Sequence, residues 1–586
     1  MQLTPLDWVI VAASLALSFA PALYLARRAG SSTAEFFTSG RSAPWWLVGV
    51  SMVATTFSTD TPNLVTDLVR QGGVAANWAW WAFLLTGMTT VFFYARLWRR
   101  LGVLTDLEFY ELRYSGRAAT LVRGFRAVYL GVVFNVVIMA SVNLAAAKIA
   151  NVLLDWPIGR TLLVCGVLNV AFAATSGLWG VLVTDFFQFG IAMAGSFSAA
   201  VYALGHPAVG GLSGLVARLP APTLAFVPDL TDWAVSVPIF IVPLAVQWWS
   251  TWYPGAEPGG GSYIAQRMLA ARSERDAMGG TLLFNVAHYA LRPWPWILVA
   301  LASILAFPTL DDIRRALPHV DPVLVGHDMA YPAMLTFLPA GVLGLMVAGL
   351  LAAYVSTIST HLNWGTSYLV HDLYRRFVNP DADERHYVMV GRLTTAALMI
   401  AAGLLTLVLE SARTTFNLLL SIGAGTGLLY LLRWFWWRIN AWSEIAAMAS
   451  SFLLAVALLV LDRQGHGVPQ HVALVITVAV TTIVWLAVTF LTPPTSPETL
   501  RAFVARVGPA GPGWAAVRQG MAAAPPVDDL DGALVGWVSS CAFIYSALFA
   551  TGFFLLGRPA AGAAASVVLV VSGVVAWRAV ARAWAR

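Results

Sequence analysis

Long apolar segments recur along the whole chain and limit what it can fold into. A helix needs about 20 mostly apolar residues to cross a bilayer, and a scan of the 586 residues finds about fifteen such segments. They lie near residues 6–26, 43–66, 76–98, 121–153, 158–176, 178–204, 231–252, 278–307, 334–374, 387–409, 414–435, 441–461, 470–491, 533–556 and 563–582. Backbone polar groups in lipid must be satisfied within the protein, so the pattern predicts an all-α integral membrane protein with many spans.

The composition excludes several classes of protein. Hydrophobic residues make up 59% of the chain and charged residues only 11%, whereas soluble domains carry about 25% charged residues. A soluble enzyme, a disordered protein and a nucleic-acid-binding protein are therefore excluded. The two cysteines, Cys165 and Cys541, lie in apolar runs and form no metal or disulfide motif. No nucleophile–base or metal-ligand constellation stands out either, so we expect no enzyme.

Arginines are distributed unevenly between the loops that join the segments. With the N-terminus outside, the cytoplasmic loops hold groups such as Arg96 and Arg99, and the opposite loops hold scattered single arginines. Basic residues favour the cytoplasmic side, so we expect a bacterial inner (plasma) membrane protein with its C-terminus in the cytoplasm. The net charge of +6 then reflects topology. Residues 1–7 hold no basic residue and Arg27 follows the apolar run, which favours a retained first helix over a signal peptide.

The segments divide into two blocks of five, with extra helices at both ends. We expect an N-terminal extra helix over 1–35, one five-helix repeat over 36–205 and a second over 206–440. Extra C-terminal helices occupy 441–586, and a Pro-, Ala- and Gly-rich cytoplasmic loop lies near 492–532. This composition predicts a surface linker with at most one short amphipathic helix.

Two segments, 43–66 and 231–252, are interrupted by polar or Pro/Gly-rich sequence at matching places. Paired broken helices are typical of the binding site of an inverted-repeat transporter. Around Pro62 in the first segment stand hydroxyl and carboxyl side chains: Thr55, Thr56, Ser58, Thr59, Asp60 and Thr61. Freed carbonyls and hydroxyls are oxygen donors suited to a small hard cation. A proline-kinked helix whose threonines bond to their own backbone explains the same pattern.

Oxygen-bearing side chains also lie inside two other segments. Ser356 aligns with Ser359, and Thr357 with Thr360, because residues three apart share a helix face. Asp185 lies within an apolar helix, and an intramembrane carboxylate is a candidate functional residue by default. The alternatives are hydroxyls that bond to their own helix, and a carboxylate that is protonated or held in a salt bridge. Together these groups offer the oxygen-rich, partly anionic coordination that a dehydrated Na⁺ needs.

Several runs resemble the sodium/solute symporter family in order and spacing. They are F-F-T-S-G-R-S-A-P-W-W-L-V-G-V-S-M-V-A-T (36–55), T-D-F-F-Q-F (184–189), Q-R-M-L-A-A-R-S (266–273), L-P-A-G-V-L-G-L-M-V-A-G-L-L-A-A-Y-V-S-T-I-S-T (338–360) and L-L-R-W-F-W-W-R-I-N-A (431–441). The resemblance implies a LeuT-type fold, a 5+5 inverted repeat with one extra N-terminal and about four extra C-terminal transmembrane helices. It also implies Na⁺-driven uptake of a solute by alternating access.

The resemblance further implies where Na⁺ binds. The main site falls on backbone oxygens of Ala54, Phe57 and Ala353 and on the hydroxyls of Ser356 and Thr357. Some members have a second site, whose matching positions are Asp185, Ser356, Ser359 and Thr360. We therefore expect one coupling Na⁺, with a second as a further hypothesis.

Candidate solute-binding residues come from three places. The first break offers Thr56, Ser58 and Asp60, and other segments offer Lys148 and Arg292. Lys148 has an alternative role, in which it extends to the outer interface. The tryptophans near residue 80 are expected to form an interface belt.

The third place is Gln247 and Trp248, which precede a Pro/Gly-rich run over 254–262. This run departs from the family pattern. It fits either a ligand-shaped break in the helix or a long inner loop that begins near Tyr253.

These features predict a Na⁺-coupled importer of a small polar organic solute, with the lipid bilayer as surroundings and no obligate protein partner. Sugars, sugar acids, amino acids and small carboxylates all remain open. One alternative is H⁺ coupling through Asp185 on the same fold, although paired hydroxyls favour Na⁺. Another is a transporter-derived sensor that binds solute without net transport, but a loop of about 40 residues leaves little room for a signalling domain.

Overall fold

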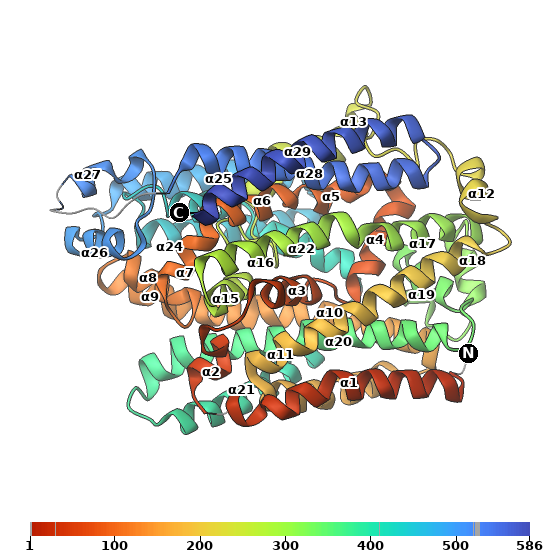
Figure 1. Cartoon of the computed structure of the whole chain (residues 1–586), viewed down its shortest axis with the longest axis horizontal. Coiled ribbons are helices and arrows are strands. Elements are labelled where there is room, and N and C mark those ends of the chain that lie inside the picture. The colour runs from red at the N-terminus through yellow and green to blue at the C-terminus, as the bar shows by residue number, and fades with distance from the viewer. Residues whose placement is uncertain (1–2, 30, 410, 520, 522–527, 586) are drawn as a thin grey trace.

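The helices lie side by side along one common axis, with the two chain ends at opposite ends of that axis (Figure 1). The structure is a computed structural model and describes residues 3–29, 31–409, 411–519, 521 and 528–585. Within those residues, 11 helices are long and apolar enough to cross a membrane. The expected all-α membrane fold is confirmed.

Short and long helices alternate along the chain. The first half contains α1 (Pro5–Ala29), α2 (Thr33–Thr38), α3 (Trp45–Thr55), α4 (Asp60–Gly72), α5 (Trp78–Trp81), α6 (Phe83–Thr89), α7 (Ala95–Leu101), α8 (Phe109–Arg113), α9 (Gly116–Val128), α10 (Asn135–Leu154), α11 (Ile158–Leu204), α12 (Gly211–Arg218), α13 (Trp233–Ser236), α14 (Trp248–Ser250), α15 (Ser262–Ala270) and α16 (Glu274–Val286). The second half contains α17 (Pro293–Ala306), α18 (Leu310–Ala316), α19 (Ala330–Leu335), α20 (Val342–Ser367), α21 (Glu384–Thr406), α22 (Ala412–Gly423), α23 (Gly427–Leu432), α24 (Ala441–Leu461), α25 (Gln470–Leu491), α26 (Pro497–Val507), α27 (Ala515–Arg518), α28 (Leu530–Leu555) and α29 (Pro559–Ala585).

The number of expected segments is larger than the number of long helices, 11, because some spans are discontinuous or short. The segment 43–66 consists of α3 and α4, and the segment 414–435 consists of α22 and α23. The segments 158–176 and 178–204 meet within α11 at Gly177, whose φ of +53° and ψ of −164° break the helical path. Such backbone angles are accessible to glycine at little cost.

The first broken helix stops at Thr55 and restarts at Asp60. Pro62 therefore lies in the first turn of α4, where a missing amide proton costs nothing. The alternative considered from the sequence, a proline-kinked helix whose threonines bond to their own backbone, holds only in part. Thr56 Oγ1 donates to the carbonyl oxygens of Met52 and Val53 at 3.1 and 3.0 Å, but the helix is interrupted before Pro62 and not kinked at it.

The second broken helix stops at Ser250, and α15 restarts it at Ser262. Most of the connecting run 251–261 is buried. At Gly259, φ is +77° and an added Cβ would lie 2.7 Å from the carbonyl oxygen of Tyr430. The Pro/Gly-rich run is therefore a break in a helix inside the protein, and the alternative prediction of a long inner loop is wrong.

The run 492–532 was expected to be a surface linker with at most one short amphipathic helix, but its residues 497–518 are packed against the core. It forms α26 and α27, and the rings of Phe503 and Trp514 stack with centroids 5.6 Å apart. Trp514 Nε1 donates to the carbonyl oxygen of Trp434 at 2.8 Å. The guanidinium of Arg113 lies 4.7 Å from the Trp514 ring. Burial of these aromatic side chains thus fixes the segment against the core, although its small-residue composition predicted no such packing.

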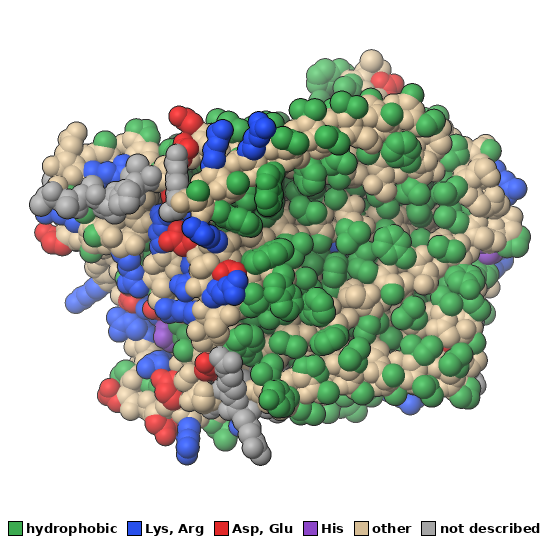
Figure 2. Space-filling model, in the orientation of Figure 1, with side chains coloured by type: hydrophobic (Ala, Val, Ile, Leu, Met, Phe, Trp, Pro, Cys, Tyr) green, Lys and Arg blue, Asp and Glu red, His purple; other side chains and the backbone are tan. Residues whose placement is uncertain are grey.

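Charged side chains gather at one end of the molecule and a broad apolar surface covers its middle (Figure 2). The charged end carries α8, α9, α26 and α27, whereas the described N-terminal residues lie toward the opposite end (Figure 1). An apolar surface of this extent is the one that a bilayer covers.

Candidate functional site: a cavity between two broken helices

A cavity of about 100 Å³ lies where the two broken helices face each other. Residues from the α3–α4 break, α10, the run after α14, the α16–α17 junction, α20 and α22 line it. They include Thr56, Ser58, Asp60, Trp80, Ser141, Tyr253, Tyr263, His288, Arg292, Thr357, His361 and Phe416. The structure thus brings Thr56, Ser58, Asp60 and Arg292 together, as their assignment to one solute site requires.

Asp60 is held by hydroxyl groups. Its Oδ2 accepts from Ser141 Oγ of α10 at 3.3 Å, and the Ser58 hydroxyl donates to Oδ1. Asp60 is also the first residue of α4, and the N-terminal amides of a helix stabilise a carboxylate. The carboxylate oxygens of Asp60 are thus bound by hydroxyl donors, and no cation pairs with them among the described residues.

Arg292 is buried, with 1% of its surface exposed. Its Nη1 donates to the carbonyl oxygen of Val53 at 3.1 Å and to Thr56 Oγ1 at 3.2 Å. Its Nη2 contacts His288 Nδ1 at 2.5 Å, and the guanidinium lies 5.3 Å from the Trp296 ring. No carboxylate in the described part of the chain pairs with it, and its buried Nε has no hydrogen-bond partner. The guanidinium is therefore fixed in place with its charge uncompensated.

Aromatic rings form much of the remaining wall. Tyr253 stacks on Phe83 with centroids 5.5 Å apart and meets Phe416 edge-on at 5.1 Å. Trp80 is only 7% exposed and lies edge-on to His288 at 5.7 Å. The interface role expected for this tryptophan is wrong, because the side chain faces the protein interior. One signal was available for His288, since it lies one turn before Arg292 on the same segment.

The expected main ion site lies where the end of α3 meets α20. Thr357 Oγ1 donates to the carbonyl oxygen of Thr55 at 2.8 Å and lies 3.0 Å from the carbonyl oxygen of Ala353. The carbonyl oxygen of Ala54 accepts from the Phe57 amide at 3.0 Å. Carbonyl and hydroxyl oxygens from the break and from α20 are thus close together here.

Asp185 lies beside this region and is tied to two hydroxyls. Ser356 Oγ donates to Asp185 Oδ1 at 2.6 Å, and Ser51 Oγ donates to Oδ2 at 2.5 Å. Ser359 Oγ donates to the carbonyl oxygen of Ser356 at 3.2 Å. Ser356 is therefore shared between the two expected ion sites.

Arg267 of α15 also reaches this region. It is fully buried, and its Nη2 donates to Thr360 Oγ1 at 2.6 Å while its Nε donates to Ser51 Oγ at 3.2 Å. Sequence reasoning placed this arginine in a family-like run but gave it no role. Its guanidinium and Asp185 share Ser51 as a common neighbour.

Three candidate solute-binding residues lie away from the central cavity. Lys148 Nζ lies 2.7 Å from Asp328 Oδ2 in a buried ion pair. Gln247 lines a separate cavity of about 320 Å³ and donates from Nε2 to the carbonyl oxygen of Ala79 at 2.7 Å. Trp248 faces α28, with its ring 5.9 Å from that of Trp537. The structure gives each of them a partner within the protein.

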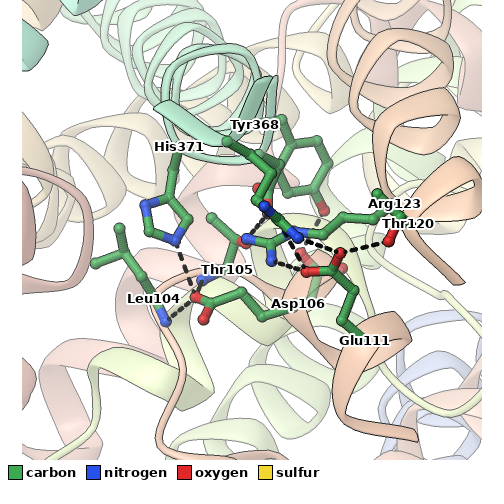
Figure 3. A network of polar contacts seen from close by, with 11 residues as sticks. Leu104, Thr105, Asp106, Glu111, Thr120, Arg123, Tyr368 and His371 are labelled. Carbon is green, nitrogen blue, oxygen red and sulfur yellow. Dashed lines mark hydrogen bonds and ion pairs between the residues drawn. The ribbon is translucent and has the colours of Figure 1, made fainter. Parts of the chain in front are cut away.

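A network of ion pairs and hydrogen bonds joins several segments near the charged end of the molecule (Figure 3). Arg123 of α9 pairs with Glu111 at 2.6 Å and with Asp372 at 2.7 Å. Glu108 pairs with His371 at 3.2 Å. Burial by itself would raise the pKa of Glu108, but the hydrogen bond and charge of His371 and the charge of Arg123 lower it to about 2. The network ties the segment before α9 to the π-helical turn Tyr368–Val378 that follows α20.

Comparisons with known proteins agree with this architecture. Residues 36–452 match the Sodium:solute symporter family. The sodium/glucose cotransporter of Vibrio parahaemolyticus is 25% identical over 473 residues, which cover 77% of this chain and 85% of that protein. The sodium/mannose cotransporter of Bos taurus is 25% identical, and the match covers 68% of each chain.

A solved structure shares the fold. A Na⁺-coupled sialic acid symporter, in a substrate-bound outward-open state, superposes with a TM-score of 0.67 at 19% identity and covers 84% of this chain and 99% of that chain. The family match spans most of the described helices and includes both broken ones. This chain therefore belongs to the sodium:solute symporter family, and it is a multi-pass membrane transporter that couples solute movement to Na⁺ rather than an enzyme.

Proposed function

We propose that this symporter imports a small polar organic solute together with one Na⁺ by alternating access. The ion binds the carbonyl oxygens of Ala54, Phe57 and Ala353 and the hydroxyls of Ser356 and Thr357. The solute binds next to it in the central cavity. Na⁺ and solute then stabilise the same state because the α3–α4 break contributes to both sites.

The contact of Thr357 with the end of α3 carries this proposal. The hydroxyl lies 2.8 Å from the carbonyl oxygen of Thr55 and 3.0 Å from that of Ala353. A Na⁺ that draws these oxygens together holds the broken helix against α20. When the ion leaves toward a low-sodium interior, that restraint is lost and the solute site loosens. This is the differential interaction with two states that coupling requires.

One ion per cycle fits the charges around Asp185. Thr360, a ligand of the hypothetical second site, already accepts from Arg267 at 2.6 Å. A guanidinium at that distance repels a further cation. In this arrangement Arg267 supplies the positive charge that a second Na⁺ would bring, and Ser356 remains available to the main site.

The charge distribution supports an orientation in the membrane. The arginine-rich end in Figure 2 is the cytoplasmic end, as the preference of basic residues for that side requires. The N-terminus then lies outside and the C-terminus inside. We place the protein in a bacterial inner (plasma) membrane, where an inward Na⁺ gradient drives uptake.

Purified protein in liposomes tests the ion site. Ser356→Ala and Thr357→Ala should raise the Na⁺ concentration for half-maximal uptake by about 10-fold or more, since each removes one oxygen ligand. The matched control is Ser367→Ala on the same helix, whose hydroxyl only donates to the carbonyl oxygen of Trp364 at 2.7 Å. Unchanged Na⁺ activation in both site variants, with all three folded, would refute the proposed site.

Counting the Na⁺ ions taken up with each solute molecule tests the stoichiometry. One Na⁺ crossing 100 mV contributes about 2.3 kcal/mol, and the ratio of ²²Na⁺ to solute taken up should be one. A ratio of two would restore the second site at Asp185, Ser356, Ser359 and Thr360. For that result, Arg267 would have to leave Thr360 during the cycle.

A further inference from the structure

Two opposite charges line the central cavity, and neither has a counter-charge. Asp60 is bound by the hydroxyls of Ser58 and Ser141. Arg292 is bound by a carbonyl, a hydroxyl and an imidazole nitrogen. The two side chains do not pair with each other, and no other ion pair among the described residues includes either of them.

Charges left like this inside a membrane protein are expensive. An ionised side chain at bilayer depth normally pairs with an opposite charge or marks a substrate pathway. Elsewhere in the described chain, buried Lys148 pairs with Asp328 and buried Arg433 pairs with Glu444. Buried Arg113 and Arg267 form no ion pair with any described residue, but they bind neutral oxygen acceptors and do not line this cavity. Asp60 and Arg292 differ from these residues because both line the central cavity.

The two charges are close enough for a small molecule to reach both. Arg292 donates to Thr56 Oγ1 at 3.2 Å, and Thr56 and Asp60 are four residues apart, so their Cα atoms are separated by at most about 14 Å. Asp60, Tyr253 and Arg292 line the same cavity. The cavity volume of about 100 Å³ lies well below the roughly 300–1,000 Å³ typical of drug-sized ligands.

We propose that the solute is a small zwitterion whose ammonium group binds Asp60 and whose carboxylate binds Arg292, an assignment that rests on the proposed function above. The planar guanidinium suits a carboxylate, which it can bind through two parallel hydrogen bonds. The oxygens of Asp60, Ser58 and Ser141 surround the opposite group. Trp80 and Tyr253 line the same cavity, and aromatic rings attract cations.

A neutral polyol fits the same cavity less well. Its hydroxyls can bond to both charges, but they leave each charge uncompensated in a buried site. A solute with only one charge compensates one of the two residues and leaves the other as a buried charge without a counter-charge. A zwitterion compensates both without changing the net charge of the site.

Matched solutes test the proposal in proteoliposomes with an inward Na⁺ gradient, with K⁺ replacing Na⁺ as control. The zwitterions are glycine, alanine, proline, γ-aminobutyrate and glycine betaine, each tested beside its amine-only and carboxylate-only analogue and beside glucose. At least one zwitterion should be taken up, and both of its single-charge analogues should bind about 10- to 100-fold more weakly, as expected for a lost charged hydrogen bond.

Variants assign each end of the solute. Asp60→Asn should abolish the preference for the zwitterion over its carboxylate-only analogue, and Arg292→Gln should abolish the preference over the amine-only analogue. Asp229→Asn and Arg558→Gln, at exposed positions outside the cavity, should leave both preferences unchanged. If either cavity variant fails to fold, Asp60→Glu and Arg292→Lys keep the charge and should keep the preferences with weaker binding.

The outcomes separate this inference from the function on which it rests. Na⁺-dependent uptake of glucose but of no zwitterion would overturn the zwitterion and leave Na⁺-coupled import standing. Equal zwitterion uptake in Na⁺ and K⁺ would overturn the coupling and keep the solute class. Folded protein that responds to no zwitterion in either salt overturns the inference.

Discussion

Thr357 Oγ1 in α20 lies 2.8 Å from the carbonyl oxygen of Thr55, the last residue of α3. These two residues are far apart in sequence and belong to different repeats. Their contact joins the break in the first core helix to the helix that carries the paired hydroxyls. In the proposed function, this hydroxyl links the Na⁺ site to the solute cavity.

Thr357→Ser should keep Na⁺ activation close to that of the wild type, whereas Thr357→Val should weaken it by about 10-fold or more. Serine retains the oxygen that faces Thr55, and valine keeps the shape but loses the oxygen. The measurement is Na⁺-dependent uptake across a range of Na⁺ concentrations. Equal Na⁺ activation in the serine and valine variants would show that shape, not the oxygen, matters at this position.

Asp185→Asn should destabilise the protein because it leaves the buried Arg267 charge without its nearby carboxylate. The two charges are linked through Ser51 rather than paired directly, so the melting temperature should fall, by less than the roughly 3–5 kcal/mol that breaking a direct buried pair costs. Arg267→Gln should also lower it. The double variant should recover part of the loss, since residues that share a network are not additive. Strict additivity of the two losses would mean that the residues act independently despite their shared neighbour Ser51.

Lys148→Met should lower stability without changing the solute concentration for half-maximal uptake. Lys148 Nζ lies 2.7 Å from Asp328, and the two side chains are 4% and 9% exposed. Loss of one partner leaves a buried charge and costs roughly 3–5 kcal/mol. Changing Asp328 to Asn as well should restore part of the melting temperature. A variant with normal stability but weakened solute binding would place Lys148 in the solute pathway instead.

The stabilising effect of Glu108 should depend on pH at the acid end. Its folded-state pKa of about 2 lies below the ordinary 4.5, so folding favours the ionised form by roughly 3 kcal/mol. That contribution is fully present above the unfolded pKa and is lost as pH falls toward 2. The difference in melting temperature between wild type and Glu108→Gln should therefore narrow from pH 7 to pH 3.5. Glu498→Gln, at an exposed carboxylate, should give no such narrowing.

Much of the fold was predictable because the bilayer imposes simple rules on a sequence. Length and hydropathy located the spans, and the boundary between residues 158–176 and 178–204 agrees with the break at Gly177. Both interrupted helices were predicted from Pro, Gly and polar residues. The packing of the segment around Trp514 was not predicted. Most residues around Trp514 are small, and the residues that bury its aromatic ring lie far away in the sequence.

The solute cavity was predictable only in part. Thr56, Ser58, Asp60 and Arg292 were identified because polar groups are costly in an apolar span. Lys148 met the same criterion, yet it pairs with Asp328, which lies in a short connecting turn. Trp80 was misjudged because a tryptophan at a membrane interface and one in a cavity wall look alike in sequence. The free-energy cost of a polar residue in an apolar span marks that residue as a candidate, but it does not reveal which group compensates it.

The sequence by itself determined that the chain is a helical membrane protein with two broken helices and that it resembles Na⁺-coupled symporters. Hydrophobicity, helix-breaking residues and motif order are local properties, so they can be read along the chain. Only the tertiary structure decided that Lys148 has an oppositely charged partner, whereas Asp60 and Arg292 have none among the described residues. Compensation of charge depends on distances between residues from distant segments, and folding alone sets those distances.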